Sequence, residues 1–114
     1  MIAYGHPLRI ISAASTNANV IKKAYGTLLG MAIFNSAGAA RYLKLYDKAT
    51  NPNPAVDVPI ATYTIPANGS LIIPNSMCGI KFETGIACLI TTVASDTDAT
   101  ATGANEVIAN FLYL

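Results

Sequence analysis

Apolar and polar residues alternate along most of the chain with a period of two. β-Branched and aromatic residues gather in short runs separated by Gly, Pro, Asn, Asp and Ser. Such a pattern is typical of β-strands, whose successive side chains point to opposite faces. We expect strands over the runs 8–13, 18–24, 27–35, 40–47, 60–65, 70–73, 80–84, 86–93 and 105–113. Residues 94–103 are expected to form a polar loop, because their Asp and Thr residues favour turns over helix interiors.

Turn and breaker residues between the runs predict how the strands are joined. Segment 50–58 is expected to be a loop, because its prolines cannot donate to a strand ladder. Asn68-Gly69 is a strong hairpin signal, since both residues tolerate a positive φ. Many short strands with frequent turns predict an all-β fold, a two-sheet antiparallel sandwich. We prefer a jelly-roll topology to an immunoglobulin-like one, because the chain has no Trp for an immunoglobulin core.

Two of the runs are apolar on both faces. Run 27–35 is therefore expected to be a central strand buried on both sides. The last strand, from Glu106 to Leu114, is also apolar on both faces. It is expected to be buried in the core of its own chain in preference to a neighbouring subunit.

The composition indicates that the chain binds a partner. The chain has 114 residues, enough for one domain, with an N-terminal arm expected over 1–7 and the sandwich over 8–114. Hydrophobic residues make up 53% and charged residues only 11%, whereas soluble domains carry about 25% charged residues. Some of the surface is therefore expected to be buried against another chain, because large apolar patches left in water invite association.

Charge and hydropathy argue against two other partners. The most apolar stretch, residues 28–40, is interrupted by glycines and polar residues and is too short for a spanning helix of about 20 residues. The formal net charge is +1 and no basic cluster is present, so we expect no nucleic acid and no membrane as partner. Residues 1–12 lack the basic start and clean apolar core of a signal peptide, which suggests assembly in a cytoplasm.

Residues that could carry chemistry are few. His6 is the single histidine and is expected to be a surface or arm residue. Zinc needs four Cys or His ligands, or three and a water, and the three such residues of this chain are spread from 6 to 88, which argues against a zinc site. The acidic segment 96–98 lacks the later Gly and Glu of a calcium loop. Cys78 and Cys88 are expected to be buried free thiols, although a disulfide between them stays open. We therefore expect no enzyme, with no catalytic, metal or cofactor-binding residue and no cofactor.

The run from Arg41 to Lys48 is the most informative segment for binding. Leu43 and Leu45 face one way in a strand, and a row of Tyr and Lys residues faces the other way. Such a row suits the ordinary solvent face of a sandwich, a protein-contact face or a stacking platform for nucleic acid, in that order of preference. The candidate protein-interface residues are Tyr42, Lys44, Tyr46 and Lys48 of this row, together with Tyr4 and His6 of the arm.

An ordered series of segments spans roughly residues 12 to 113. It comprises Ser15-Thr16-Asn17, Asn35-Ser36-Ala37, the run Ala40 to Lys48, Pro59, Ile65-Pro66 and the run Gly79 to Ile86. In this order the segments resemble small structural proteins of tailed bacteriophages that decorate or cement the capsid. The resemblance implies a β-sandwich or jelly-roll subunit of the virion, located on the capsid surface and assembled in the host cytoplasm. It supplies no catalytic residue.

The resemblance also implies partners and a mechanical role. A cement protein would bind the major capsid protein between neighbouring shell subunits, as a homotrimer or homodimer, through its N-terminal arm or an exposed sheet edge. Many modest contacts repeated around a shell add up to a large stabilisation. Two alternatives remain open: a tail or fibre-base component, and a carbohydrate-binding jelly roll that would use Tyr42, Tyr46 and Tyr63.

Overall fold

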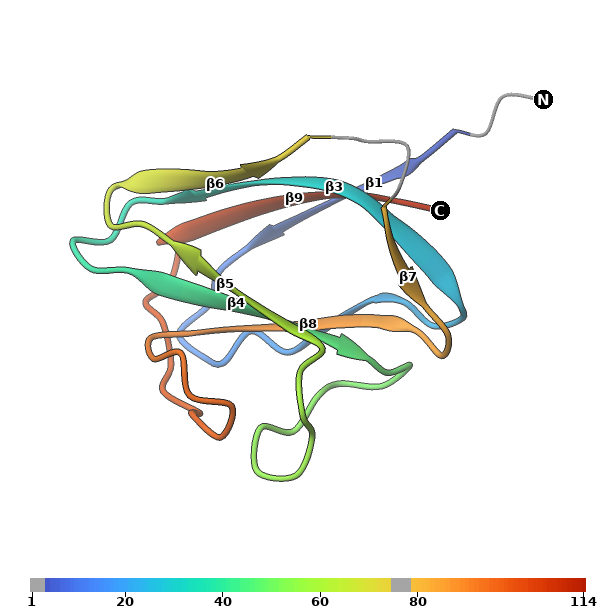
Figure 1. Ribbon diagram of the computed structural model, residues 1–114. Helices are drawn as coiled ribbons and strands as arrows, with labels where there is room; N and C mark the ends of the chain where they lie inside the picture. Colours follow the sequence, from blue (N-terminus) through green and yellow to red (C-terminus); the bar gives the residue numbers. More distant parts are fainter. Residues whose placement is uncertain (1–3, 75–78) are drawn as a thin grey trace.

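The protein is a sandwich of two antiparallel β-sheets (Figure 1). The computed structural model describes residues 4–74 and 79–114, and within these residues there are nine strands and no helix. The strands are β1 (His6–Ile11), β2 (Asn19–Lys22), β3 (Gly26–Asn35), β4 (Arg41–Asp47), β5 (Ala61–Ile65), β6 (Gly69–Ile73), β7 (Ile80–Phe82), β8 (Ile86–Thr91) and β9 (Val107–Tyr113). The predicted all-β, two-sheet sandwich is confirmed.

Strands from distant parts of the chain lie side by side in both sheets. Sheet A has the order β1-β9-β3-β6, and β7 pairs with one end of β3. Sheet B has the order β2-β8-β4-β5. Every pairing among the described strands is antiparallel. Among these strands, β4 and β5 of sheet B are the only paired neighbours that are consecutive in the chain, and sheet A has none.

The core lies between the two sheets and is built from the inward row of each strand. Sheet B contributes Leu43, Leu45, Ile65, Ile86, Cys88 and Ile90, and sheet A contributes Leu28, Met31, Ile33, Phe82, Val107, Ala109 and Phe111. The last strand, β9, is paired on both sides, by β1 and β3, and places alternate residues in this core. The expectation that the C-terminal strand lies in its own core is confirmed.

The strand ends differ in detail from the sequence pattern. β1 begins at His6 instead of at residue 8, because His6 and Pro7 are in register with Tyr113 and Leu112 of β9. Two residues of the expected arm 1–7 therefore belong to the sheet, and residues 1–3 of that arm lie outside the described part of the chain. Segments 50–58 and 94–103 are loops, as expected.

One expectation about burial is wrong. β3 is central in sheet A, between β9 and β6, but it is not buried on both sides. Phe34, on its outer face, is 49% exposed. An apolar face on a central strand predicts that the face is covered, but it does not say by what. The cover can be a partner chain instead of another part of the same chain.

No helix in the described residues is long and apolar enough to span a membrane. The two longest loops, which follow β4 and β8, both lie on the side of sheet B that faces away from sheet A (Figure 1). The outer faces of the two sheets are therefore in different environments, and this difference decides where an interface can form.

Candidate protein interface

The predicted row on β4 is largely covered by the chain's own loops. Lys44 is 0% exposed and Tyr46 is 1% exposed, while Tyr42 and Lys48 are half-buried. The preferred expectation, that this row forms the solvent face of the sandwich, is therefore wrong for Lys44 and Tyr46. A partner could reach these two side chains only if the loops moved away.

The loop after β8 holds Lys44 in place. The Lys44 Nζ donates a hydrogen bond to the Ser95 carbonyl oxygen at 2.5 Å. Burial lowers the pKa of Lys44, and the nearby carboxylates of Asp98 and Asp96 oppose part of this change. A buried ammonium is costly unless it is paired and hydrogen-bonded, so this contact ties the loop to the sheet.

The loop after β4 covers the other end of the row. Lys48 Nζ lies 2.6 Å from the Asp57 carboxylate, which also accepts the Asn53 backbone N–H at 2.7 Å. These two contacts, the backbone N–H first, lower the pKa of Asp57. Tyr46 lies close by, and its hydroxyl has no hydrogen-bond partner among the described residues. Burial raises the pKa of Tyr46, and the charges of Asp57 and Asp96 add to this effect.

Glu106 fixes the far end of the 94–106 segment to β4. Its carboxylate accepts hydrogen bonds from Arg41 Nε at 3.0 Å, from Arg41 Nη2 at 3.3 Å and from the Gly103 backbone N–H at 2.9 Å. The guanidinium contact, followed by the Gly103 N–H, lowers the pKa of Glu106. Because two parallel N–H bonds are made to one carboxylate, the pair fixes orientation as well as charge.

Two polar side chains join this segment to the turn after β1. Ser12 Oγ donates to the Gly103 carbonyl oxygen at 2.9 Å and accepts the N–H groups of Glu106 and Val107, each at 3.0 Å. Asn17, which adopts a φ of 57°, donates from Nδ2 to Thr102 Oγ1 at 2.7 Å. The loop that covers sheet B is therefore part of the folded domain and held at several points.

Tyr4 and His6 lie at the edge of sheet A. Tyr4 is 78% exposed, and His6 is exposed on the edge strand β1. The His6 ring lies 5.5 Å from the ring of Tyr113, tilted by 38°. These two residues are the members of the predicted interface that a partner can reach directly, and they are not close to the β4 row, which belongs to the other sheet.

The tyrosines expected to bind a sugar do not form one platform. Tyr46 is buried on the outer side of β4, and Tyr42 lies on the same side. Tyr63, in register with the core residue Leu43, packs against the core between the sheets. Stacking on a sugar needs aromatic faces exposed on one surface, so this set does not support the carbohydrate alternative.

The outer face of sheet A carries an apolar surface that sequence analysis did not single out. Register places its residues in three rows across the strands: Ile11, Ile108, Phe34 and Ser70; Arg9, Asn110, Ala32 and Ile72; and Pro7, Leu112 and Gly30. We call these eleven residues the apolar face. Ile11 is 44% exposed and Ile72 is 54% exposed, and Arg9 is the single charged member.

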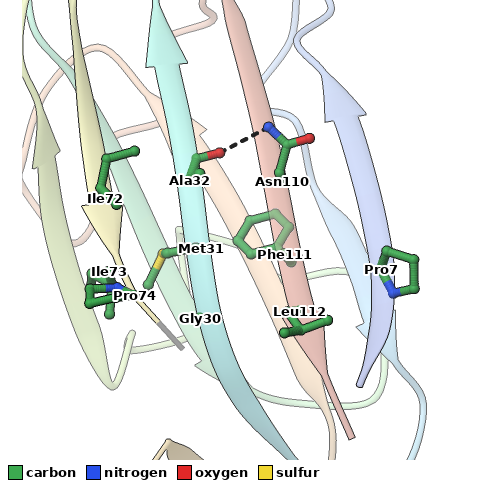
Figure 2. A pocket seen from close by; sticks show the side chains of 10 residues that line it. All are labelled: Pro7, Gly30, Met31, Ala32, Ile72, Ile73, Pro74, Asn110, Phe111 and Leu112. Atoms are coloured by element: carbon green, nitrogen blue, oxygen red, sulfur yellow. Dashed lines mark hydrogen bonds between the residues drawn. The ribbon is translucent and has the colours of Figure 1, made fainter. Parts of the chain in front are cut away.

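The third row of the apolar face contains a shallow hollow of about 330 Å³. Figure 2 shows that Gly30 lies at its centre, with Leu112 and Pro7 on one side and Ile73 and Pro74 on the other. Gly30 is itself buried and has no side chain, so the hollow lies over its backbone beside the Leu112 side chain. In the neighbouring row, Asn110 Nδ2 donates to the Ala32 carbonyl oxygen at 3.0 Å, so the side-chain amide is hydrogen-bonded within sheet A.

The remaining candidates for chemistry are in structural positions. Cys88 lies in the core, and burial raises the pKa of its thiol to about 12. Cys78 lies outside the described residues, so its expected state is not tested. Asp98, in the acidic segment 96–98, accepts hydrogen bonds from Thr100 Oγ1 and the Val93 N–H. No group of three or more His, Cys, Asp or Glu residues is arranged to hold a metal ion within residues 4–74 and 79–114.

No known protein family, curated protein or solved structure matches this chain. The resemblance to small virion proteins therefore rests on the segments quoted from the sequence, and the function has to be argued from the molecule itself.

The signal that could have located the apolar face was present in the sequence. Run 27–35 and the last strand are both apolar on two faces, and the structure places them side by side in sheet A. Two neighbouring strands that are apolar on both faces indicate that the outer face of their sheet, as well as the inner one, is to be buried. Polarity in the 41–48 run, by contrast, pointed to the face that the loops cover.

Proposed function

We propose that this chain is a structural protein of a tailed bacteriophage virion, a capsid decoration protein that binds between major capsid subunits and stabilises the head shell. It would act as a homotrimer or homodimer, assembled in the host cytoplasm and located on the capsid surface. The observation that carries the proposal is the apolar face of sheet A. A face of this kind supports a role in assembly, because burial against another chain removes it from water.

Three positions support a structural role over a catalytic one. His6 packs against Tyr113 at the start of an edge strand. Glu106 is bound by Arg41 and the Gly103 N–H. The Cys88 thiol, with a pKa of about 12, is buried in the core and is a poor nucleophile at neutral pH. These three residues, which could do acid–base or nucleophilic chemistry, thus already have packing or pairing roles.

The strand order supports classing the sandwich as a jelly roll. If β7, which pairs only with the end of β3, is set aside, eight strands remain in two four-stranded sheets. The first of these pairs with the last, the second with the last but one, and the fourth with the fifth. A jelly roll is a double sheet of eight strands built in this nested way, and it is common among viral capsid proteins.

Contact with the shell is proposed at the β1 edge of sheet A. Tyr4 and His6 are exposed there, and among the described residues β1 pairs on one side only, with β9. An edge strand can add a strand from another chain through its free backbone groups. This site leaves the broad apolar face available for contacts between copies of the protein.

Copy number in the virion tests this proposal against its nearest alternative. Purified virions of the virus that encodes the chain would be separated by gel electrophoresis, with the band identified by mass spectrometry and its staining compared with the major capsid protein. A decoration protein is expected at a copy number comparable to that of the shell subunits. A few copies per virion would support the tail or fibre-base role, and absence from the virion would refute both.

A further inference from the structure

The apolar face is an exposed apolar surface that the described part of the chain does not cover. Its exposed members Ile11, Phe34 and Ile72 lie on three different strands, so the surface spans sheet A from one edge to the other. With four strands about 4.8 Å apart and three rows about 7 Å apart, the face has a footprint of roughly 300–400 Å². That size falls in the range of the largest apolar patches on soluble proteins, which are often interaction sites.

We propose that a second copy of this chain covers the apolar face, so that two sheets A pack face to face about a two-fold axis that runs along the strands between β9 and β3. This inference rests on the homo-oligomeric state included in the proposed function, and it does not depend on location in a virion. Sheets that pack face to face keep their strands within about 30° of each other and interdigitate their side chains.

Size complementarity favours this axis. Rotation about a line between β9 and β3 places each residue of β9 opposite the residue of β3 in the same row of the other copy. Leu112 then faces Gly30 of the second copy, where the hollow of about 330 Å³ can receive its side chain. In the next row, Asn110 faces the small residue Ala32. In these two rows the copies thus fit large side chains against small ones, as packed interiors require. In the remaining row Ile108 faces Phe34, so two large apolar side chains meet there.

The position of Arg9 selects between the two symmetric arrangements that a face-to-face pair allows. The axis along the strands places Arg9 on β1 opposite Ile72 on β6 of the second copy, because both belong to the same row. The two Arg9 side chains then lie at opposite edges, three strand spacings or about 14 Å apart in the plane of the sheets. An axis across the strands through this row would instead place Arg9 directly against Arg9, which like charges disfavour.

The polar side chain near the centre of the apolar face, Asn110, already has a hydrogen-bond partner in its own chain. Asn110 Nδ2 donates to the Ala32 carbonyl oxygen of its own chain, so this donor does not lose a water partner without replacement. Arg9 lies at the rim, where its charged end can stay in water while its stem packs on apolar surface. The dimer therefore buries apolar area without leaving an unpaired charge at its centre.

Two footprints of this size bury less than the 1,200 Å² or more of a standard stable interface, so a weak, concentration-dependent dimer is expected. Light scattering over a dilution series would give a mass near 11.9 kDa at low concentration that rises toward twice this value. Ile72→Lys is expected to weaken the dimer roughly tenfold or more. Ile60→Lys is the matched control, because Ile60 is 50% exposed but lies just before β5 of sheet B, and it should leave the dimer unchanged.

A charge comparison at the same position tests the direction of the axis. Ile72→Glu would face Arg9 of the second copy, whereas Ile72→Lys would repel it. With two rim pairs in each dimer, the Glu variant is expected to bind roughly fivefold or more tightly than the Lys variant, with the difference shrinking in high salt. The double variant Arg9→Glu, Ile72→Lys should restore the association that Ile72→Lys loses.

Several results would overturn the inference. They are a wild-type protein that stays monomeric to ~1 mM, a mass of three chains, equal association of Ile72→Lys and Ile60→Lys, or equal association of the Glu and Lys variants at position 72. Circular dichroism checks that each variant is folded, which is expected because position 72 is exposed. A monomer with high copy number in virions would refute this inference and the homo-oligomeric state on which it rests, but not the virion role, and a dimer missing from virions would refute the virion role alone.

Discussion

The outer faces of the two sheets reverse the usual relation between polarity and exposure. On sheet B, the charged side chain of Lys44 is 0% exposed because the loop after β8 lies over it. On sheet A, Ile72 is 54% exposed, and no described loop is bonded across it. The chain thus covers its more polar face with its own loops and leaves its more apolar face open.

This difference teaches that a covering segment, and not residue polarity alone, decides which face of a sandwich meets water. The 94–106 segment is held over sheet B by hydrogen bonds from Ser12, Asn17, Arg41 and Lys44. Such bonds need polar side chains beneath and beside the loop, which explains why the covered face is the polar one. An apolar face offers a loop no such bonds, so it suits a partner that brings its own apolar surface.

Truncation of one apolar side chain on each face should give the largest contrast. Leu89→Ala, on the covered face of sheet B, is expected to cost about 2–5 kcal/mol of unfolding free energy, because the side chain is 0% exposed and leaves a cavity. Ile72→Ala, on the apolar face, is expected to cost less than about 1 kcal/mol, since half of its side chain is already in water. Urea unfolding at low protein concentration, where the monomer prevails, measures both.

Equal losses for the two variants would contradict the comparison, because they would mean that the two faces are buried to the same degree in solution. Repeating the Ile72→Ala measurement at high protein concentration sharpens the test. If the apolar face pairs with a second copy, the cost of this variant rises with concentration, since the dimer binds only the folded state. The Leu89→Ala cost should not change with concentration.

The sequence predicted the fold better than it predicted the surface. Period-two alternation located every strand to within a few residues, because strand faces are set by local pattern. A turn is present at Asn68, with a φ of 49°, but the predicted hairpin is wrong, because β5 lies in sheet B and β6 in sheet A, so the turn joins the two sheets. The environment of Tyr46 could not be predicted, because it depends on loops from residues 48–60 and 92–106 that reach the same face. Loop placement follows from long-range bonds such as that of Asn17 to Thr102, which leave no periodic signal.

Weakening the attachment of the covering loop should give a smaller, pH-dependent effect. Glu106→Gln removes the charge that Arg41 contacts and is expected to cost about 1 kcal/mol at neutral pH. The contact with Arg41 holds the pKa of Glu106 below its ordinary value of 4.5, so its stabilisation is complete above about pH 4.5 and is lost as the pH falls through the lowered pKa. The stability difference between wild type and Glu106→Gln should therefore shrink in acid, as measured by urea unfolding at several pH values.

Glu83→Gln is the matched control for this prediction. Glu83 also lies near a cation, with its carboxylate 3.4 Å from Lys81 Nζ, but both side chains are more than two thirds exposed. Exposed pairs of this kind contribute little, so the substitution should leave stability unchanged at every pH. A loss in Glu106→Gln that is equally large at acid and neutral pH would indicate packing, and not the charge, as the source of the Glu106 contribution.

The smallest effect on global stability is expected when the buried charge of Lys44 is removed and the aliphatic part of its side chain is kept. Lys44→Met deletes the hydrogen bond to the Ser95 carbonyl oxygen but also removes the cost of burying an ammonium group, which is the cause of its lowered pKa. The two changes oppose each other, so global stability should change by less than about 1 kcal/mol. The loop should nevertheless loosen locally, because Ser95 loses its tie to sheet B.

Hydrogen exchange can separate this local effect from global stability. The Asp98 N–H, which bonds to the Ser95 carbonyl oxygen, is expected to exchange roughly tenfold faster in Lys44→Met. The Thr102 N–H should change less, because it bonds to Ser15 and its side chain is held by Asn17. Lys81→Met, at an exposed lysine of sheet A, should alter neither amide. If the Asp98 amide keeps its wild-type rate, then Lys44 is not what holds the loop, and the polar face would be covered because of the Arg41, Ser12 and Asn17 contacts alone.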